Sequence, residues 1–256
     1  MDRTPALDAI CYKRNFLTEV IARLDFVSPV AGIASELPKA LSAGLLRYFP
    51  IGEPQPMFTQ KIQVLPTAVA EPPKKEFTQW NFFGMRREKR AVLTPNFLFV
   101  SFNTYETYEK LRAEFLAILT PFFQGFPDAQ PSRMGLRYIN SLSFDLKNPL
   151  KWDGYLNRKL LSLFSFPIPG AEPARVFHNL EVAYPDFSLR FQFGMHNPDY
   201  PAPIRQSVFV LDFDAYHQGL IAASDVQSLL DKFHSAIQSL FEQAITPALR
   251  EVLNAD

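Results

Sequence analysis

The feature that most constrains the fold of this 256-residue sequence is a pattern that occurs twice, about 110 residues apart. The first copy lies within the segment 80–126, and each copy leads through a tyrosine to a long amphipathic helix. Landmarks that recur in the same order are typical of an internal duplication. The recurring landmarks are Phe83-Gly84-Met85 and Phe193-Gly194-Met195, Phe99-Val100 and Phe209-Val210, and Tyr105 and Tyr216.

Hydrophobic periodicity predicts the same order of elements in both halves: a strand, a helix, about three strands and a second helix. The predicted strands are 15–26, 61–65, 79–85, 90–102 with a turn or bulge at Pro95-Asn96, 134–144, 175–184, 188–195 and 207–213. The predicted helices are one that follows an N-cap at Ser35 and ends before Pro50, and those over 108–123, 152–164 and 224–253. Pro247 is expected to kink or divide the last helix, and 70–75 is expected to be a loop.

These elements predict an α+β fold, built as an internally duplicated β-α-β-β-β-α unit. Residues 1–133 form the first predicted repeat and residues 134–256 the second, in one pseudo-symmetric domain. Each repeat supplies an antiparallel half-sheet with one apolar face, so the helices must lie on that face. When the two half-sheets join edge to edge, two exposed edges are removed. The resulting saddle resembles the TATA-binding protein and helix-grip folds in architecture.

Composition and charge restrict the classes of function. Formal net charge is zero, so any attraction to nucleic acid or anionic membrane must come from a local patch. A lone cysteine, Cys11, supports neither an internal disulfide nor a cysteine-based zinc site. The first residues lack the pattern of a secretory signal, and no apolar run reaches the roughly 18 residues of a membrane span. We therefore expect a cytoplasmic globular protein without a membrane partner.

Three short motifs carry a likeness to a known family: Tyr12-Lys13-Arg14-Asn15 followed by Glu19-Val20, Trp80 with Phe82, and the run Gly135-Leu136-Arg137-Tyr138-Ile139-Asn140. They resemble a bacterial family of about this length known as sporadically distributed proteins, which has no assigned function. The resemblance covers nearly the whole chain and implies a shared fold without an activity. In that family the Arg-Tyr-Ile-Asn run is commonly followed by another arginine, whereas Ser141 stands there in this chain.

A cluster of basic residues between aromatic residues is the most suggestive candidate site. Six basic and two acidic residues lie within 74–90, and the basic ones are Lys74, Lys75, Arg86, Arg87, Lys89 and Arg90. Basic groups would contact phosphates, and an exposed ring such as Trp80 could stack on an unpaired base. The alternative is a solvated hairpin tip whose aromatic residues face the core, because alternate strand residues must face inward.

A second candidate lies in the middle of the predicted strand 134–144. Arg137 and Ile139 share one face of that strand, and Tyr138 and Asn140 share the other. A partly buried arginine needs an anionic partner, which is either a carboxylate of the protein or a ligand. The intramolecular candidates are Asp212 and Asp214 on the predicted strand that begins at residue 207.

The sequence predicts no catalytic residue, no cofactor and no metal site. The four histidines, His178, His196, His217 and His234, have none of the spacings that place two ligands on one metal, and no nucleophile-elbow, P-loop or dinucleotide-binding motif occurs. An enzyme whose site is assembled only by the fold is still an alternative.

Three functions are therefore considered. The leading prediction is a non-enzymatic binding or assembly module that holds a partner on its open sheet face or in an inter-repeat cleft. That partner is another protein or a second copy of the chain. A second copy would be held by the apolar residues of the last helix. The alternatives are a nucleic-acid-binding protein that uses the hairpin 74–90, and an enzyme with a site assembled by the fold.

Overall fold

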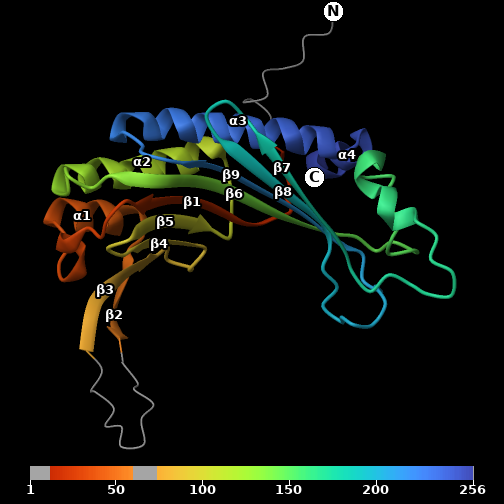
Figure 1. Cartoon of the computed structure of the whole chain (residues 1–256), viewed down its shortest axis with the longest axis horizontal. Coiled ribbons are helices and arrows are strands. Elements are labelled where there is room, and N and C mark those ends of the chain that lie inside the picture. Colours follow the sequence, from red (N-terminus) through yellow and green to blue (C-terminus); the bar gives the residue numbers. More distant parts are fainter. Residues whose placement is uncertain (1–11, 60–73, 256) are drawn as a thin grey trace, which may run out of the picture. The chain divides into compact units, whose positions relative to one another are not determined.

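The computed structural model describes residues 12–59 and 74–255. Within these residues, nine strands form one open antiparallel sheet in an α+β fold, as predicted. The strands are β1 (Leu17–Phe26), β2 (Ile51–Thr59), β3 (Lys74–Phe83), β4 (Lys89–Leu93), β5 (Phe97–Phe102), β6 (Pro131–Ser143), β7 (Val176–Ala183), β8 (Ser188–Met195) and β9 (Val208–Gln218). Their order in the sheet is β2-β3-β4-β5-β1-β6-β9-β8-β7 (Figure 1).

The helices of the described residues fall into α-helices and short 3-10 helices. The α-helices are α1 (Lys39–Tyr48), α2 (Tyr108–Gly125), α3 (Val226–Ala244) and α4 (Pro247–Asn254). The 3-10 helices are η2 (Ala31–Ala34), η3 (Arg158–Ser165) and η4 (Ala223–Asp225).

The chain divides into two compact units. As far as it is described, unit 1 takes in the residues up to Val20, Gly135–His217 and the residues from Ser228 onward. Unit 2 takes in the described residues of Ile21–Met134, together with Gln218–Gln227. The units are defined by compactness, so the repeat boundary between residues 133 and 134 stays a prediction.

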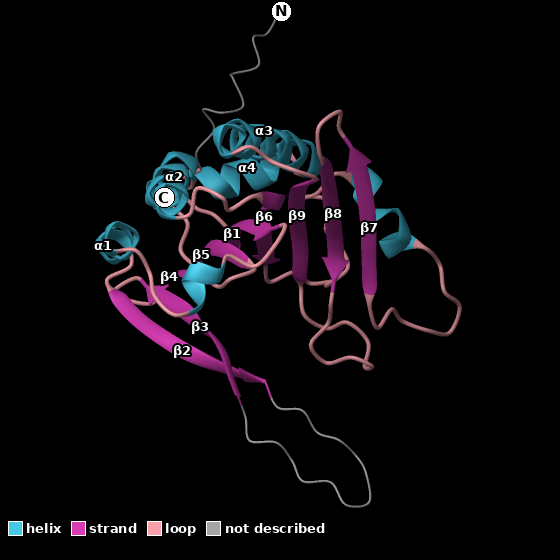
Figure 2. Cartoon of the chain, turned by 60° about the vertical axis from the view of Figure 1, so that its left-hand side comes forward, coloured by secondary structure: helices cyan, strands magenta, loops and turns pink. Residues whose placement is uncertain are grey.

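In unit 2, α1 and α2 lie on one face of the strands (Figure 2). The predicted helix 108–123 is confirmed as α2, whose first turn is capped by the Thr107 side chain accepting a hydrogen bond from the Lys110 amide. Its apolar side is buried, and Phe122 stacks on Phe26 of β1 with ring centroids 5.2 Å apart. The apolar residues that recur with a helical period in the sequence therefore form the side of α2 that covers the sheet.

The start of α1 differs from the prediction. The helix begins at Lys39, its N-cap residue is Pro38, and no side chain caps it, so the predicted N-cap at Ser35 is wrong. A proline disfavours helical backbone at the residue before it, so Leu37 cannot join the helix. The helix starts only once the proline has been passed.

In unit 1, α3 packs on β6, on β9 and on Phe187, the residue before β8. Phe233 is buried against Phe187, and Phe241 meets the ring of Phe213 edge-on at 6.2 Å. The predicted helix 224–253 is divided at Pro247, which opens α4 behind an N-cap at Thr246. Proline suits the first turn of a helix because its missing N–H would have no helical partner there.

The predicted helix 152–164 is wrong over its first half. Residues 153–155 form a turn, Leu156 forms an isolated bridge with Ile245, and only η3 is helical. Trp152 is fully buried, and its ring nitrogen donates to the carbonyl of Pro149 at 2.8 Å. The Asn157 amide donates to the carbonyl of Ala244 at 2.8 Å. The contact with Ala244 is tertiary, as is a bridge between Leu156 and Ile245, and these two hold the backbone of the segment out of its helical period.

Strand β2 was not predicted, because its sequence contains Pro54 and Pro56. It lies at one end of the sheet order, and proline is tolerated in an edge strand. The predicted strand 61–65 and residues 70–73 of the predicted loop 70–75 lie outside the described residues, as do the side chains of Lys74 and Lys75. The loop prediction is wrong for its last two residues, which begin β3.

The two sides of the sheet have matching strand orders. Outward from the centre, β1-β5-β4-β3 on one side matches β6-β9-β8-β7 on the other, and β2 extends the first series. The landmarks Phe99-Val100 in β5 and Phe209-Val210 in β9 therefore hold matching places. Phe83 lies in β3, however, and Phe193 lies in β8, whose matching strand is β4. The Phe-Gly-Met landmark does not follow the matching order.

Candidate functional site

The strand face of unit 2 that α1 and α2 leave uncovered carries phenylalanines and arginines. In β5, Leu98 and Val100 are fully buried on the helix side, whereas Phe97 and Phe99 are partly exposed on the other. In β1, Arg23 shares that uncovered face, because it alternates with buried residues.

The strand register places further residues on the same face. Phe83 of β3 lies opposite Arg90 of β4, and Arg90 lies opposite Ser101 of β5. The Nε atom of Arg90 donates to Ser101 Oγ at 3.1 Å, which draws its guanidinium over the sheet. Residues directly opposite in an antiparallel pair share a face, so these side chains join those of β5.

These arginines stack on the phenylalanines. The Arg23 Cζ atom lies 4.3 Å from the Phe97 ring centroid, the Phe97 and Phe99 rings are 5.9 Å apart, and Arg90 Cζ lies 5.1 Å from Phe99. Arg87 Cζ lies 4.5 Å from the Phe83 ring. We define the Arg-Phe surface by its residues Arg23, Phe83, Arg87, Arg90, Phe97 and Phe99.

Two carboxylates neutralise part of the charge on the Arg-Phe surface. Asp25 accepts a bidentate contact from Arg23, with Arg23 Nε 2.9 Å from Asp25 Oδ1, and lies 3.6 Å from Arg133 Nη1. Glu53 pairs with Arg87, and both side chains are about half exposed. Asp25 is thus shared between Arg23 and Arg133, Glu53 pairs with Arg87, and Arg90 adds a further guanidinium to this face.

The predicted basic cluster of the β3–β4 turn is divided between two faces. Arg87 and Arg90 belong to the uncovered face, whereas Lys89 lies on the helix side. Its Nζ atom donates to Glu114 of α2 at 2.7 Å and lies 5.0 Å from the Phe49 ring centroid. Lys89 is therefore part of the packing between sheet and helix.

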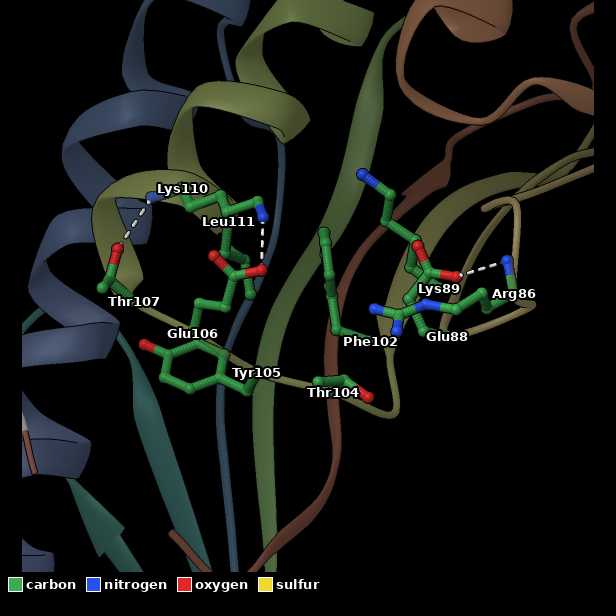
Figure 3. A pocket seen from close by; sticks show the side chains of 10 residues that line it. All are labelled: Arg86, Glu88, Lys89, Phe102, Thr104, Tyr105, Glu106, Thr107, Lys110 and Leu111. Carbon is green, nitrogen blue, oxygen red and sulfur yellow. Dashed lines mark hydrogen bonds and ion pairs between the residues drawn. The ribbon is translucent and has the colours of Figure 1, made fainter. Parts of the chain in front are cut away.

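Arg86 lines a small pocket on the helix side, between the β3–β4 turn and the start of α2 (Figure 3). The pocket has a volume of about 170 Å³. Its lining residues are Arg86, Glu88, Lys89, Phe102, Thr104, Tyr105, Glu106, Thr107, Lys110 and Leu111. The Glu88 carboxylate accepts hydrogen bonds from the backbone amides of Glu88 and Arg86, which hold its pKa below the usual value. Lys110 pairs with Glu106, so much of the pocket's charge is balanced within the protein.

Trp80 does not join the Arg-Phe surface. It lies opposite Leu93, which is fully buried, and its ring nitrogen donates to the carbonyl of Ile33 at 2.8 Å. The indole is thus used to hold η2 against β3.

Arg137 pairs with Asp212, one of the two predicted intramolecular partners. Arg137 Nε lies 2.8 Å from Asp212 Oδ1, and Nη2 lies 2.6 Å from Oδ2. This bidentate contact raises the pKa of the Arg137 guanidinium. Since Asp212 is only 6% exposed, the pair is well sheltered on its acidic side.

Tyr138 and Asn140 lie on the opposite, helix-covered side of β6. The Tyr138 hydroxyl lies 3.2 Å from His234 Nδ1 of α3, and Asn140 donates to the carbonyl of Leu211 at 3.3 Å. Both side chains are buried. Of the three candidate residues Arg137, Tyr138 and Asn140, only Arg137 therefore lies on the uncovered face.

The uncovered face of unit 1 carries further charged residues beside Arg137. Arg190 lies opposite Asp214 in the β8–β9 register and 3.6 Å from Glu181 of β7. The Tyr216 hydroxyl donates to Glu181, and this hydrogen bond raises the pKa of Tyr216. Arginines and carboxylates on this face therefore pair with one another.

The described residues contain no group of three or more histidine, cysteine, aspartate or glutamate side chains arranged to hold a metal ion. No helix among them has both the length and the apolar character needed to cross a membrane. The ring of His178 is stacked on Phe193 with centroids 4.8 Å apart. Its Nε2 atom is the one buried side-chain polar atom of the described residues that lacks a hydrogen-bond partner.

Sequence reasoning missed Arg23, Phe97 and Phe99. The available signal was in β5, where phenylalanines alternate with Leu98 and Val100, so that the strand is apolar on both faces. An antiparallel strand normally alternates apolar and polar residues. The second apolar face of β5 was therefore the sign that this strand contributes side chains to the Arg-Phe surface.

Comparison with models of known protein families and with curated proteins gave no match. The resemblance to the sporadically distributed proteins thus stays a prediction.

Proposed function

We propose that the chain is a binding module that holds single-stranded nucleic acid on the Arg-Phe surface of unit 2. The observation that carries this proposal is the unbroken run of contacts from Arg23 through Phe97 and Phe99 to Arg90. The run crosses β1, β5 and β4, so its side chains are held on a hydrogen-bonded scaffold.

The arginines supply the phosphate contacts. A guanidinium is always charged and offers a planar fork of donors that matches two oxygens of a phosphate. Arginines from β1, β4 and the β3–β4 turn gather on this face, whereas the chain as a whole has zero net charge. A short stretch of nucleic-acid backbone is therefore attracted to this surface in particular.

The rings and guanidiniums supply stacking surfaces for bases. Base–aromatic stacking contributes about 1–3 kcal/mol per base, and guanidinium planes stack on bases as well. The Phe97 and Phe99 rings are partly exposed, and the arginines that cover them are themselves planar. Only unpaired bases expose their faces, so the surface favours single strands over duplexes.

Fluorescence anisotropy with labelled oligo-dT, oligo-U and a matched duplex tests the proposal. We expect micromolar binding of a single strand, with two to four phosphate contacts and a slope of log affinity against log salt of about −1.4 to −2.8. Weaker binding of the duplex is expected. An absence of salt-dependent binding to either single strand would overturn the proposal and favour a protein partner for this surface.

Two substitutions with matched controls localise the site. Phe99→Leu keeps an apolar cover but removes the ring, and should weaken binding about tenfold. Arg90→Gln should weaken binding and make the salt slope shallower. The controls are Phe166→Leu and Arg205→Gln, which change exposed residues of unit 1. Equal affinities for Phe99→Leu and Phe166→Leu would place the site elsewhere.

We also propose that the chain arose by duplication of a β-α-β-β-β-α unit. The matching strand orders outward from β1 and β6, and the place of α2 and α3 after β5 and β9, support it. Only the Phe-Val landmark agrees with this correspondence, so the two copies have diverged in the strands before it.

A further inference from the structure

Strand β7 ends the sheet and presents a free edge. In the described part of the chain it pairs with β8 alone. The Tyr184 amide donates to the carbonyl of Phe187 just beyond β7, which fixes the alternation of the antiparallel ladder. The backbone N–H and C=O groups of Phe177, Asn179, Glu181 and Ala183 therefore point away from β8.

The side chains around this edge are unusually apolar for an exposed position. Leu180, in the middle of β7, is 47% exposed. Beside the strand, η3 and the residues after it expose Leu163, Phe166 and Ile168, and Phe164 of the same segment lies 6.2 Å from the His178 ring. A free edge flanked by exposed apolar side chains is a site at which another strand can pair.

We propose that a second copy of this chain pairs with β7 across this edge, antiparallel and around a two-fold axis at Leu180. In this register Leu180 lies opposite Leu180 of the second copy, and Asn179 lies opposite Glu181. Antiparallel pairing places opposed residues on the same face, so leucine meets leucine on the helix side and amide meets carboxylate on the uncovered side.

The charges of the strand favour a second copy in this register. Glu181 is the one acidic residue of β7, and a two-fold axis at Leu180 keeps the two Glu181 carboxylates apart. Each carboxylate, which accepts from Tyr216 of its own chain, instead lies opposite an Asn179 amide that can donate to it as well. The outward backbone groups at positions 177, 179, 181 and 183 find partners in the same register, because each lies opposite another outward position.

Analytical ultracentrifugation of the full chain over a range of concentrations tests the proposal. We expect a species of twice the 29.2 kDa chain mass. Leu180→Lys puts two like charges opposite each other and should shift the population to the monomer. Asn179→Pro removes an outward N–H that β8 does not use, so it should break the pairing while sparing the sheet of each copy.

Leu220→Lys is the matched control, because Leu220 is 69% exposed in unit 2, and its dimer should persist. Circular dichroism and thermal unfolding show whether each variant is folded. A wild-type chain that stays monomeric at all concentrations, or a dimer that survives both β7 substitutions, would overturn the proposal.

A cysteine cross-link tests the register. In a Cys11→Ser background, Leu180→Cys places two thiols opposite each other in a pair without mutual backbone hydrogen bonds, where the Cα atoms are about 4.5 Å apart. Mild oxidation should yield a covalent dimer, whereas Val182→Cys should stay monomeric on a denaturing gel. Cross-linking by Val182→Cys in place of Leu180→Cys contradicts the proposed register.

Discussion

The uncovered strand faces of the two units have the same backbone architecture and different electrostatics. In unit 1, Arg137 pairs with Asp212 and is also acted on by Asp214 and Glu19, and Arg190 lies opposite Asp214 and near Glu181. In unit 2, Arg23, Arg87 and Arg90 stack on phenylalanine rings, and Arg23 and Arg133 share one carboxylate, that of Asp25. The Arg137–Asp212 pair is sheltered on its acidic side, whereas both partners of the Arg87–Glu53 pair are about half exposed, so a ligand can compete for the guanidinium more easily in unit 2.

The two units also differ at the glycine of the repeated Phe-Gly-Met, in how strictly the structure requires a glycine there. Gly194 has a φ of +143°, and a Cβ atom there would lie 2.2 Å from the carbonyl oxygen of Val176. A Cβ atom at Gly84 would meet the Glu88 carboxylate, the end of a flexible side chain. Only Gly194 is demanded by the backbone itself.

The largest expected effect follows from this difference. Gly194→Ala should lower the free energy of unfolding by about 3 kcal/mol, because it combines a disfavoured φ with a backbone clash. Gly84→Ala should cost less than about 1 kcal/mol, because Glu88 can turn away. Urea denaturation of both variants measures the two costs. Equal costs would mean that the two glycines have the same role.

The next effect tests how firmly the unit 1 arginine is held. Asp212→Asn leaves the half-buried Arg137 without its carboxylate and should destabilise the protein by about 2 kcal/mol, less than a fully buried pair because solvent reaches Arg137. The readout is again the midpoint of urea unfolding. A loss below about 0.5 kcal/mol would show that the pair contributes no more than an exposed one.

A smaller effect sharpens the contrast in charge. Asp25→Asn removes the carboxylate that Arg23 and Arg133 share, so oligonucleotide affinity should rise about threefold and its salt dependence should steepen. The matched change in unit 1, Asp214→Asn, should leave the affinity unchanged. Anisotropy titrations of the two variants side by side decide this, and an equal rise in both would point to net charge alone.

The smallest effect concerns the exposed pair of unit 2. Glu53→Gln should change the free energy of unfolding by only about 0.3 kcal/mol, because both partners of the Arg87–Glu53 pair are near half exposed. Chemical denaturation provides the value. A cost as large as that of Asp212→Asn would remove the energetic distinction between the two faces.

Strong periodicity made some elements predictable from sequence. The limits of β8 match the prediction 188–195, and α2 extends the prediction 108–123 by two residues. The prediction failed over residues 152–157 because the backbone of Tyr155, Leu156 and Asn157 pairs with residues 244–246, which local periodicity does not reveal. Periodicity thus identified elements that bury one regular stripe and failed where tertiary contacts set the backbone.

The candidate site was predictable only in part. Arg87 and Arg90 were found because they cluster in sequence, but the turn sends Lys89 to the other face. Arg23 joins them from about 65 residues away through the pairing of β1 beside β5. A surface assembled across strands requires the strand order, and one sequence does not contain that order explicitly.

The two ends of the sheet are chemically unequal, and this limits how many chains can assemble. Pro54 and Pro56 of β2 lack the N–H groups that an added strand would need, so that end rejects extension. The β7 end has no proline. If two chains pair through β7 as proposed, their β2 ends cannot add a further strand in the same way, so the assembly closes at two chains and does not continue into a fibre.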